Sequence, residues 1–209
     1  MNKIQLPISA DKIETLHVGD LVSIDGVMVT ARDAAHKYLF ENYVHGTLPA
    51  EEKPYADKLY PLLKDGFIYH CGPIVRQDDQ GHWHFVAAGP TTSIREEPYQ
   101  GEIIEHFGVR GVIGKGGMGE KTLEACRHSK AVYLHAVGGA ASLLASHVKE
   151  VIDVFKHDVF GLPEGFWVIR VEDFPAVVTI DCHGESLHRA VQDNSDAQFA
   201  RLVDEIPDD

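Results

Sequence analysis

The sequence Gly89-Pro90-Thr91-Thr92-Ser93-Ile94-Arg95 lies between an apolar run at 85–88 and a segment at 96–108 whose apolar residues have helical spacing. A strand that leads directly into a helix is typical of α/β proteins. Pro90 suits the turn between them, and a threonine or serine at this point can cap the helix. The stretch therefore predicts a strand, a tight turn and a capped helix start.

Two interpretations of this helix start remain open from the residues alone. Free backbone N–H groups and the positive end of the helix dipole suit a bound carboxylate or phosphate. Arg95 lies one helical turn beyond Thr91, so its forked guanidinium can face the same anion. Alternatively, the stretch is an ordinary capped helix with a solvent-exposed arginine.

The downstream chain repeats this unit of strand, glycine-rich loop and helix. Gly114-Lys115-Gly116-Gly117-Met118-Gly119 and Val137-Gly138-Gly139-Ala140-Ala141 each follow an apolar run and precede a helical segment. The repetition predicts parallel strands joined by right-handed crossovers. All three loops then fall at the carboxyl ends of the strands, where such sheets bind ligands. The glycines either admit a ligand close to the backbone or serve helix capping and packing.

Upstream, the segment 18–29 alternates apolar and polar residues around Asp25-Gly26, which predicts a β-hairpin. Thr30 is then expected to cap a helix that contains Arg32 and Asp33. A cation near the positive end of a helix is unfavourable unless an anion compensates it. Arg32 therefore either pairs with a carboxylate such as that of Asp33 or faces a substrate anion.

Towards the C terminus, apolar segments at 151–154, 167–171 and 176–181 predict further strands that form an antiparallel end to the sheet or barrel. Beyond them, Leu187–Ile206 is expected to be a polar, acidic helix or tail. The acidic residues that cluster at this end of the chain are Asp193, Asp196, Asp204, Glu205, Asp208 and Asp209.

The charge balance excludes some classes of function. The 209 residues carry 19 basic and 32 acidic side chains, a net charge of −13, which argues against nucleic-acid binding. The sequence has no apolar run of membrane-spanning length and no apolar signal-peptide core near Met1, so we expect a cytoplasmic protein without a membrane partner. A small anionic substrate needs locally gathered cations, and the candidates are Arg32, Arg95 and Lys115.

The cysteines and two histidines raise the question of a metal site. Cys71, Cys126 and Cys182 are odd in number and widely spaced, which disfavours a disulfide framework. Iron–sulfur ligands usually include a Cys-x-x-Cys pair, and none is present, so buried structural thiols are predicted. His82 and His84 alternate on one strand face, as either a metal pair or a solvated face. Without a third ligand in the pattern, the solvated face is favoured.

GPTTSIR and GKGGMG, with TARDAAH upstream and VGGAA downstream, resemble in content and order the β subunit of the iron–sulfur hydro-lyases, class I fumarase and L-tartrate dehydratase. In one-chain members the same region is the C-terminal domain. The resemblance runs from about Ile8 to His188 and implies a domain over 1–190 followed by an acidic extension over 191–209. It implies an α/β fold of the swivelling β/β/α type, with a central mixed sheet or partial barrel and flanking helices.

The resemblance also implies a chemistry, the reversible addition of water to a C=C bond flanked by carboxylates. A [4Fe-4S] cluster is expected on an α subunit in an α2β2 assembly, so no metal ligand is expected in this chain. Thr91 corresponds to the catalytic base, and Arg32, Arg95 and Lys115 correspond to residues that bind the carboxylates of a small dicarboxylate substrate. The supporting loop residues are Gly89, Pro90, Thr92, Gly116 and Gly117.

Some features leave alternatives open within the resemblance. ARDAAHK and VGGAA favour fumarase, whereas GKGGMGEKT is closer to tartrate dehydratase. We expect fumarate hydration to (S)-malate first and L-tartrate conversion to oxaloacetate second, with a non-catalytic dicarboxylate-binding module as a third possibility. Thr92 is the alternative to Thr91 as the base. Glu96-Glu97 departs from the Met-rich or Met-Asp sequence that many relatives carry after the arginine.

Overall fold

The computed structural model describes residues 1–204. The strands are β1 (Asn2–Gln5), β2 (Leu21–Thr30), β3 (Phe67–Tyr69), β4 (Ile74–Gln77), β5 (Trp83–Ala87), β6 (Gly111–Gly114), β7 (Val132–His135), β8 (Val148–Phe155) and β9 (Phe166–Ile180). The α-helices are α1 (Ala10–Ile13), α2 (Asp33–Leu39), α3 (Lys53–Leu63), α4 (Glu97–Phe107), α5 (Glu120–Ser129), α6 (Ala141–Ser146), α7 (His157–Phe160) and α8 (Leu187–Asp204). Shorter helical turns are η1 (Phe40–Val44), η2 (Ala50–Glu52), η3 (Ser93–Glu96) and η4 (Leu162–Glu164).

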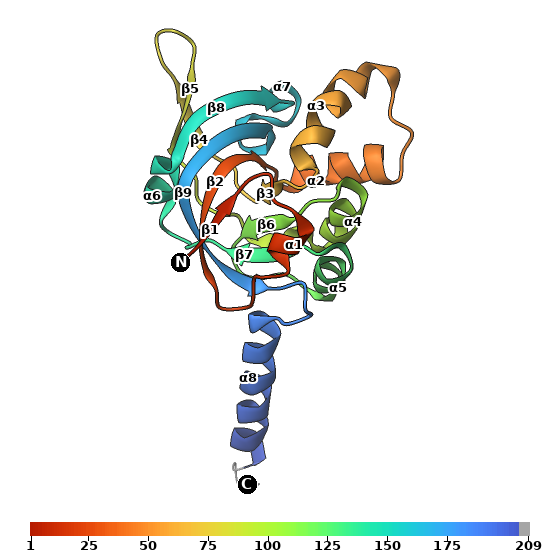
Figure 1. The fold of residues 1–209 in the computed structure, drawn as a ribbon, viewed down its shortest axis with the longest axis vertical. Helices are drawn as coiled ribbons and strands as arrows, with labels where there is room; N and C mark the ends of the chain where they lie inside the picture. The colour runs from red at the N-terminus through yellow and green to blue at the C-terminus, as the bar shows by residue number, and fades with distance from the viewer. Residues whose placement is uncertain (205–209) are drawn as a thin grey trace.

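A mixed sheet closes on itself at the centre of the fold (Figure 1). Strands β2, β3, β6 and β7 pair in parallel in that order. The long strand β9 is antiparallel to β7 on one side and to β2 on the other, which completes a five-stranded barrel. β1 extends β2 in parallel, and β8 extends β9 in antiparallel fashion. The predicted α/β fold with a central mixed sheet or partial barrel and flanking helices is confirmed.

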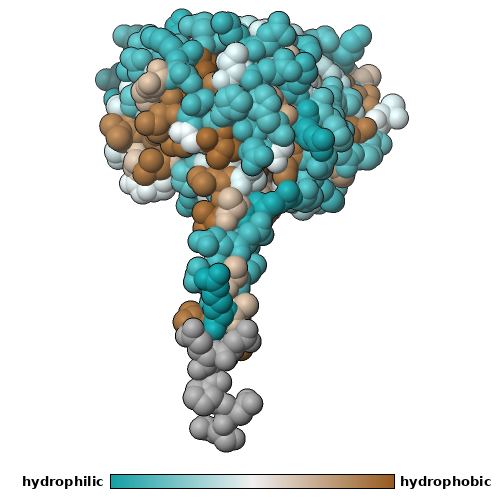
Figure 2. All heavy atoms as spheres, turned by 60° about the horizontal axis from the view of Figure 1, so that its bottom comes forward, coloured by the Kyte–Doolittle hydropathy of each residue, from teal (hydrophilic) through white to brown (hydrophobic). Residues whose placement is uncertain are grey.

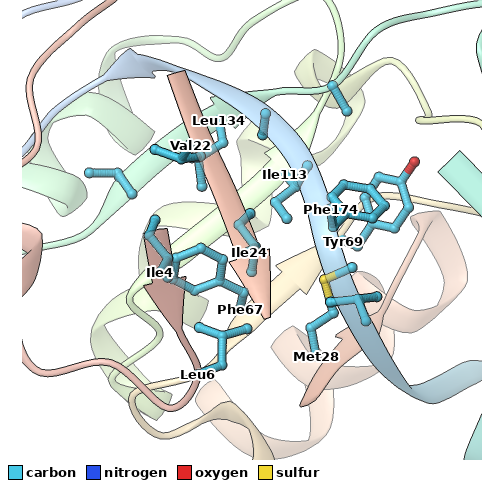
Figure 3. Close-up of a cluster of buried hydrophobic side chains, with 14 of the residues drawn as sticks. Ile4, Leu6, Val22, Ile24, Met28, Phe67, Tyr69, Ile113, Leu134 and Phe174 are labelled. Atoms are coloured by element: carbon cyan, nitrogen blue, oxygen red, sulfur yellow. The ribbon is translucent and has the colours of Figure 1, made fainter. Parts of the chain in front are cut away.

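Two apolar clusters hold the barrel and its helices together. The first fills the barrel interior, where Tyr69, Met28 and Phe174 project from different strands toward the centre (Figure 3). The second lies between the outer face of the strands and helices α2 to α5, which gather on one side of the barrel (Figure 1). Burial of such side chains is the main favourable contribution to folding. Because these two clusters form the core, the loops at the strand ends can carry polar residues without loss of core packing.

The hairpin predicted around Asp25-Gly26 is wrong, because the chain continues straight through as β2. The pairing of β2 with β9 shifts register between Ile24 and Gly26, which marks a bulge. Gly26 has φ of +119°, and a Cβ there would lie 2.7 Å from the carbonyl oxygen of Leu6. A glycine bulge and a tight hairpin require the same residue type, so sequence alone did not separate them.

The strand predicted before the central loop is also placed differently from the expectation. Residues 83–87 form β5, which pairs only with β4 in a separate two-stranded hairpin outside the barrel. β3 is the barrel strand that precedes this hairpin and the central loop. The predicted segments 167–171 and 176–181 are, as far as Ile180, parts of one antiparallel strand, β9, in which Pro175 is paired opposite Ser23. Apolar runs identify strands but do not say which sheet they join or where they merge.

Helix α8 projects away from the body of the protein (Figure 1). It confirms the helix expected at the C-terminal end as far as Asp204, whereas Glu205, Asp208 and Asp209 lie outside the described residues. The helix is mostly hydrophilic, with apolar side chains exposed along it (Figure 2), among them Val191 and Phe199. None of the helices in residues 1–204 has both the length and the apolar character needed to span a membrane.

Candidate functional site

The candidate site lies at one edge of the barrel, where the parallel strands β2, β3, β6 and β7 have their carboxyl ends. Arg32 follows β2, Lys115 follows β6, and Gly138 follows β7. The central loop reaches the same edge through backbone hydrogen bonds: Thr91 N–H donates to His70 C=O at 2.6 Å, and Lys115 N–H donates to Thr91 C=O at 3.2 Å. The structure therefore brings the predicted loops together: the Lys115 and Gly138 loops follow parallel strands, and backbone hydrogen bonds join the central loop to the same edge.

Within the central loop, Thr91 is half-buried and Thr92 is exposed. Thr92 occupies the cap position of η3, but its side chain makes no capping hydrogen bond, so the predicted cap is wrong. Pro90 bridges to Cys71, and Gly89 lies against Ala141. Backbone hydrogen bonds therefore hold the loop in place, and the hydroxyl groups of Thr91 and Thr92 are not needed for this.

Arg32 sits at the cap position of α2, where its guanidinium lies over Gly72. A Cβ on Gly72 would be 2.4 Å from Nη1 of Arg32, so only glycine leaves room for it. Nε of Arg32 is 3.4 Å from the carboxylate of Glu164 and has no hydrogen-bond partner among the described residues. Thr30 does not cap this helix, because its hydroxyl instead accepts a hydrogen bond from Trp167 N–H at 3.2 Å.

The other two predicted cations differ in their partners. Arg95 pairs with the carboxylate of Asp33, which ties η3 to the start of α2. Its side chain is 53% exposed, and an ion pair this accessible to water is worth little. Lys115 forms no ion pair within residues 1–204, and its Cδ lies close to Gly138. Both arginines therefore lie beside carboxylates of the chain itself, whereas Lys115 has no such partner within residues 1–204.

The two glycines after Lys115 lie against different neighbours. Gly116 has φ of +80° and faces the methyl group of Thr92, whereas Gly117 has φ of +91° and faces the ring of His188 at the root of α8. A Cβ on Gly117 would be 2.6 Å from that ring. The left-handed backbone at both positions favours glycine and lets the loop turn sharply over the strand end.

A buried polar network beneath the loops was missed by sequence reasoning. Its members come from α2, the end of β3, η3, α4 and β7, and each is fully buried. They are His36, His70, Ser93, Gln100 and Tyr133.

One sequence signal pointed to this network. Gln100 falls at helical spacing with Ile103, Ile104 and Phe107, so it is a polar residue in the apolar stripe of α4. Buried polar groups are hydrogen-bonded, so such a residue predicts buried partners. The identity of those partners was not visible, because they lie far away in the sequence.

Glu96 is a buried carboxylic acid next to this network. Its Oε2 lies 3.6 Å from Nδ1 of His36, and neither oxygen has a hydrogen-bond partner among the described residues. Burial raises the pKa of Glu96 to about 7 and lowers the pKa of His36. The pair is therefore biased towards an uncharged state at neutral pH.

Glu97, by contrast, has a structural role that explains the acidic departure from the family pattern. Its carboxylate accepts hydrogen bonds from the N–H groups of Gly119 at 2.8 Å and Lys121 at 2.9 Å, and from the hydroxyl of Thr122 at 2.7 Å. These groups form the start of α5. The helix that follows the glycine-rich loop therefore already holds an anion of the chain's own.

The cysteines are free and buried, in agreement with the prediction of structural thiols. Burial raises the pKa of Cys71 to about 12 and the pKa of Cys126 further still.

His82 and His84 lie at the hairpin and both contact Asp78, at 3.4 Å and 2.9 Å. Residues 1–204 contain no group of three or more His, Cys, Asp or Glu side chains arranged to hold a metal.

Comparison with known proteins gives consistent matches. The family model described as the fumarase C-terminus matches residues 1–191. A Geobacillus stearothermophilus protein named "Putative fumarate hydratase class I" is 47% identical over 205 residues, which cover 97% of this chain and 36% of that protein. The L(+)-tartrate dehydratase subunit beta of Escherichia coli is 39% identical over 182 residues, which cover 87% of this chain and 83% of that subunit.

Proposed function

The chain belongs to the fumarase C-terminus family, and on that premise we propose that it is the carboxylate-binding part of an iron–sulfur hydro-lyase. The proposed reaction is the reversible hydration of fumarate to (S)-malate. The observation that carries the proposal is the meeting of the Thr91, Arg32 and Lys115 loops at one barrel edge, with Arg95 tied to the same place through Asp33.

In the proposed mechanism, Arg32, Arg95 and Lys115 bind the two carboxylates of the diacid. In the direction from malate to fumarate, Thr91 removes a proton from the carbon beside one of them, the C–O bond on the neighbouring carbon breaks, and the hydroxyl leaves as water. The cluster of the partner would supply the Lewis acid that assists this departure. Cations that hold a carboxylate also stabilise the negative charge that develops on it as the C–H bond breaks. A threonine hydroxyl is a weak base, so it requires a nearby cation that favours its ionised form. The backbone hydrogen bond between Lys115 and Thr91 supports Lys115 in that role.

The supporting residues of the proposed site shape the loops rather than contact the reacting atoms. Gly116 and Gly117 turn the chain after Lys115, and Gly89 with Pro90 fixes the entry to the central loop. Thr92 is the alternative base, and its exposed side chain keeps that alternative open.

The iron–sulfur cluster is proposed to lie on a partner α subunit, in an α2β2 assembly. Cys71 and Cys126 belong to two different apolar clusters on opposite faces of the barrel wall. Their raised pKa values disfavour the thiolate form that binds iron. The cysteines of this chain therefore do not fit a cluster. The beta-subunit name of the Escherichia coli relative supports the existence of a partner chain.

Conversion of L-tartrate to oxaloacetate is the second candidate reaction. It is favoured by the coverage of the tartrate dehydratase subunit, of which this chain spans 83%, against 36% of the fumarase-named relative. The higher identity of 47%, against 39%, favours fumarate. We therefore rank fumarate first.

We also propose that residues 1–190 form the functional domain and 191–209 an acidic extension, which the end of the family match at residue 191 supports. Three free cysteines support a cytoplasmic location, because thiols persist in reducing compartments.

The test is anaerobic co-purification of the chain with a partner from its native cells, followed by assays with fumarate, (S)-malate and L-tartrate. We expect a brown, cysteine-rich partner and turnover of fumarate and malate. Turnover of tartrate alone would replace the first substrate by the second. Binding of dicarboxylates by the isolated chain, with no partner and no turnover, would instead indicate a binding module and contradict the hydro-lyase proposal.

A further inference from the structure

The three segments that carry Arg32, Thr91 and Lys115 are each hydrogen-bonded through the backbone to a residue of the buried network. The backbone N–H of His36 donates to Arg32 C=O at 2.8 Å, and Nδ1 of His36 lies 3.0 Å from the same oxygen. His70 C=O accepts from Thr91 N–H, and Ser93 N–H donates to Lys115 C=O at 2.9 Å. The backbone positions of the proposed base and of two proposed carboxylate ligands are therefore set by these three residues.

The side chains of the same residues are joined to one another through Gln100. Nε2 of His36 and Nε2 of His70 each lie 2.8 Å from Oε1 of Gln100, so this one side-chain amide contacts both rings. On its other side, Nδ1 of His70 lies 2.9 Å from the hydroxyl of Ser93. The hydroxyl of Tyr133 donates to Ser93 at 2.9 Å. Gln100 is thus the junction between the anchor of Arg32 and the anchors of Thr91 and Lys115.

We propose that Gln100 is a positioning residue, which fixes the spacing of Arg32 relative to Thr91 and Lys115 by holding His36 and His70 on one amide oxygen. This inference rests on the proposed function, because it assumes that those three residues contact the diacid. It adds a residue that lies outside the site loops and touches no substrate.

Directional contacts make this arrangement suited to positioning. Apolar side chains in a core slide and repack at modest cost, whereas a buried hydrogen bond is lost when its donor and acceptor move apart. The frame is also tightly packed: a Cβ on Gly114 would lie 1.7 Å from the hydroxyl oxygen of Ser93. A shift of about 1 Å between a base and the carbon it attacks costs about 100-fold in rate.

The test compares three variants of Gln100 in the assembled enzyme. Gln100→Met removes the shared amide at similar volume, Gln100→Asn keeps the amide but shortens its reach, and Gln100→Glu keeps a hydrogen-bonding group at the same length. For Gln100→Met we expect kcat to fall about 100-fold while KM rises less than about threefold, because each cation still binds its carboxylate. The kcat of Gln100→Asn should lie between the kcat of Gln100→Met and that of the unaltered protein.

Two further readouts separate positioning from simple loss of stability. Gln198→Met, on the exposed surface of α8, is the control and should change neither rate nor exchange. Amide hydrogen exchange in 88–95 and 111–119 should rise about tenfold in Gln100→Met, with no change in the hairpin at 74–87. Gln100→Glu should restore both the protection and most of kcat, with an altered pH profile because the added charge stabilises protonated histidine.

Two results would overturn the proposal. One is unchanged kcat and unchanged exchange in Gln100→Met. The other is a loss of activity in Gln100→Met that equals the loss of folded protein. In that case amide exchange would rise equally throughout the chain, and Gln100→Glu would not restore activity. If Gln100→Met does not fold, the same measurements of kcat and amide exchange on Gln100→Asn decide between the two outcomes. If the unaltered assembly turns over none of the diacids, the proposed function fails, while the exchange comparison still decides whether Gln100 holds the loops.

Discussion

Two pairs of histidines show how differently the same residue type is used in this protein. His82 and His84 stand two residues apart on a hairpin, are 68% and 46% exposed, and share the carboxylate of Asp78. His36 and His70 are far apart in the sequence, fully buried, and share the amide oxygen of Gln100. Only the first pair was conspicuous in the sequence, yet only the second lies beneath the candidate site.

The difference is one of environment. Water can replace any hydrogen bond of the exposed pair, so its loss costs little. The buried pair has no such substitute, and each broken contact leaves a desolvated donor or acceptor. We therefore expect a substitution in the buried network to cost much more stability than a substitution of the same kind at the hairpin.

The largest contrast is expected between two glycines. Gly114→Ala places a methyl group 1.7 Å from the hydroxyl oxygen of Ser93 and 3.2 Å from Nδ1 of His70, so the buried network must move. We expect a loss of about 3 kcal/mol or more in the free energy of unfolding. Gly81→Ala, on the hairpin, meets no atom within 4 Å but has φ of +84°. It should cost only about 1 kcal/mol, measured by urea denaturation.

Removal of one histidine from each pair gives the next contrast. His70→Leu removes one buried hydrogen-bond partner from Ser93 and one from Gln100, and it should cost about 2 to 3 kcal/mol in the free energy of unfolding. His84→Leu removes an exposed contact to Asp78 and should leave the midpoint of urea unfolding nearly unchanged. Equal losses for the two variants would contradict the distinction between them.

Glu96, beside the buried network, should make stability depend on pH. Its pKa is raised from 4.5 to about 7 by burial, so the folded state favours the protonated form. The contribution of this group to stability is full below pH 4.5 and is lost as pH rises towards 7. Glu96→Gln stays uncharged, so we expect equal stability at pH 4.5 and a gain of about 2 kcal/mol at pH 8. A gain that is independent of pH would show that burial of the charge is not the cause.

The smallest effect is expected at Asp78. Hydrogen bonds from His84 and from the backbone N–H of His82 lower the pKa of this partly exposed carboxyl group. Its contribution to stability is therefore present at neutral pH and is lost only in strong acid. Asp78→Asn should move the thermal midpoint at pH 7 by about 1 °C at most, and added salt should abolish any shift. A large, salt-independent shift would mean that the hairpin cluster is more than a surface contact.

Much of the site's location followed from the sequence, because parallel strands place their following loops at one edge. Lys115 and Gly138 follow parallel barrel strands, as predicted, whereas the central loop follows the β4–β5 hairpin and Arg32 follows β2, where a hairpin was predicted. Features that depended on local backbone geometry were not predictable in this way: Gly26 fitted a hairpin as well as a bulge, and 83–87 fitted a barrel strand as well as the arm of a hairpin.

The buried network was out of reach for a different reason. His36, His70 and Gln100 come from separate elements and meet only when the barrel closes and the helices pack on it. A polar residue in the apolar stripe of α4 indicated that buried partners exist, but periodicity carries no information about which residues they are.

Thr91 is the proposed base at the barrel edge that also carries Arg32 and Lys115. The turnover numbers of Thr91→Ala and Thr92→Ala in the anaerobically assembled enzyme test this proposal. We predict that Thr91→Ala loses about 100-fold or more in kcat on fumarate and malate, the size expected for a proton-transfer group. Thr92→Ala should retain most of the activity. Near-normal turnover of Thr91→Ala with loss of turnover in Thr92→Ala would contradict the assignment.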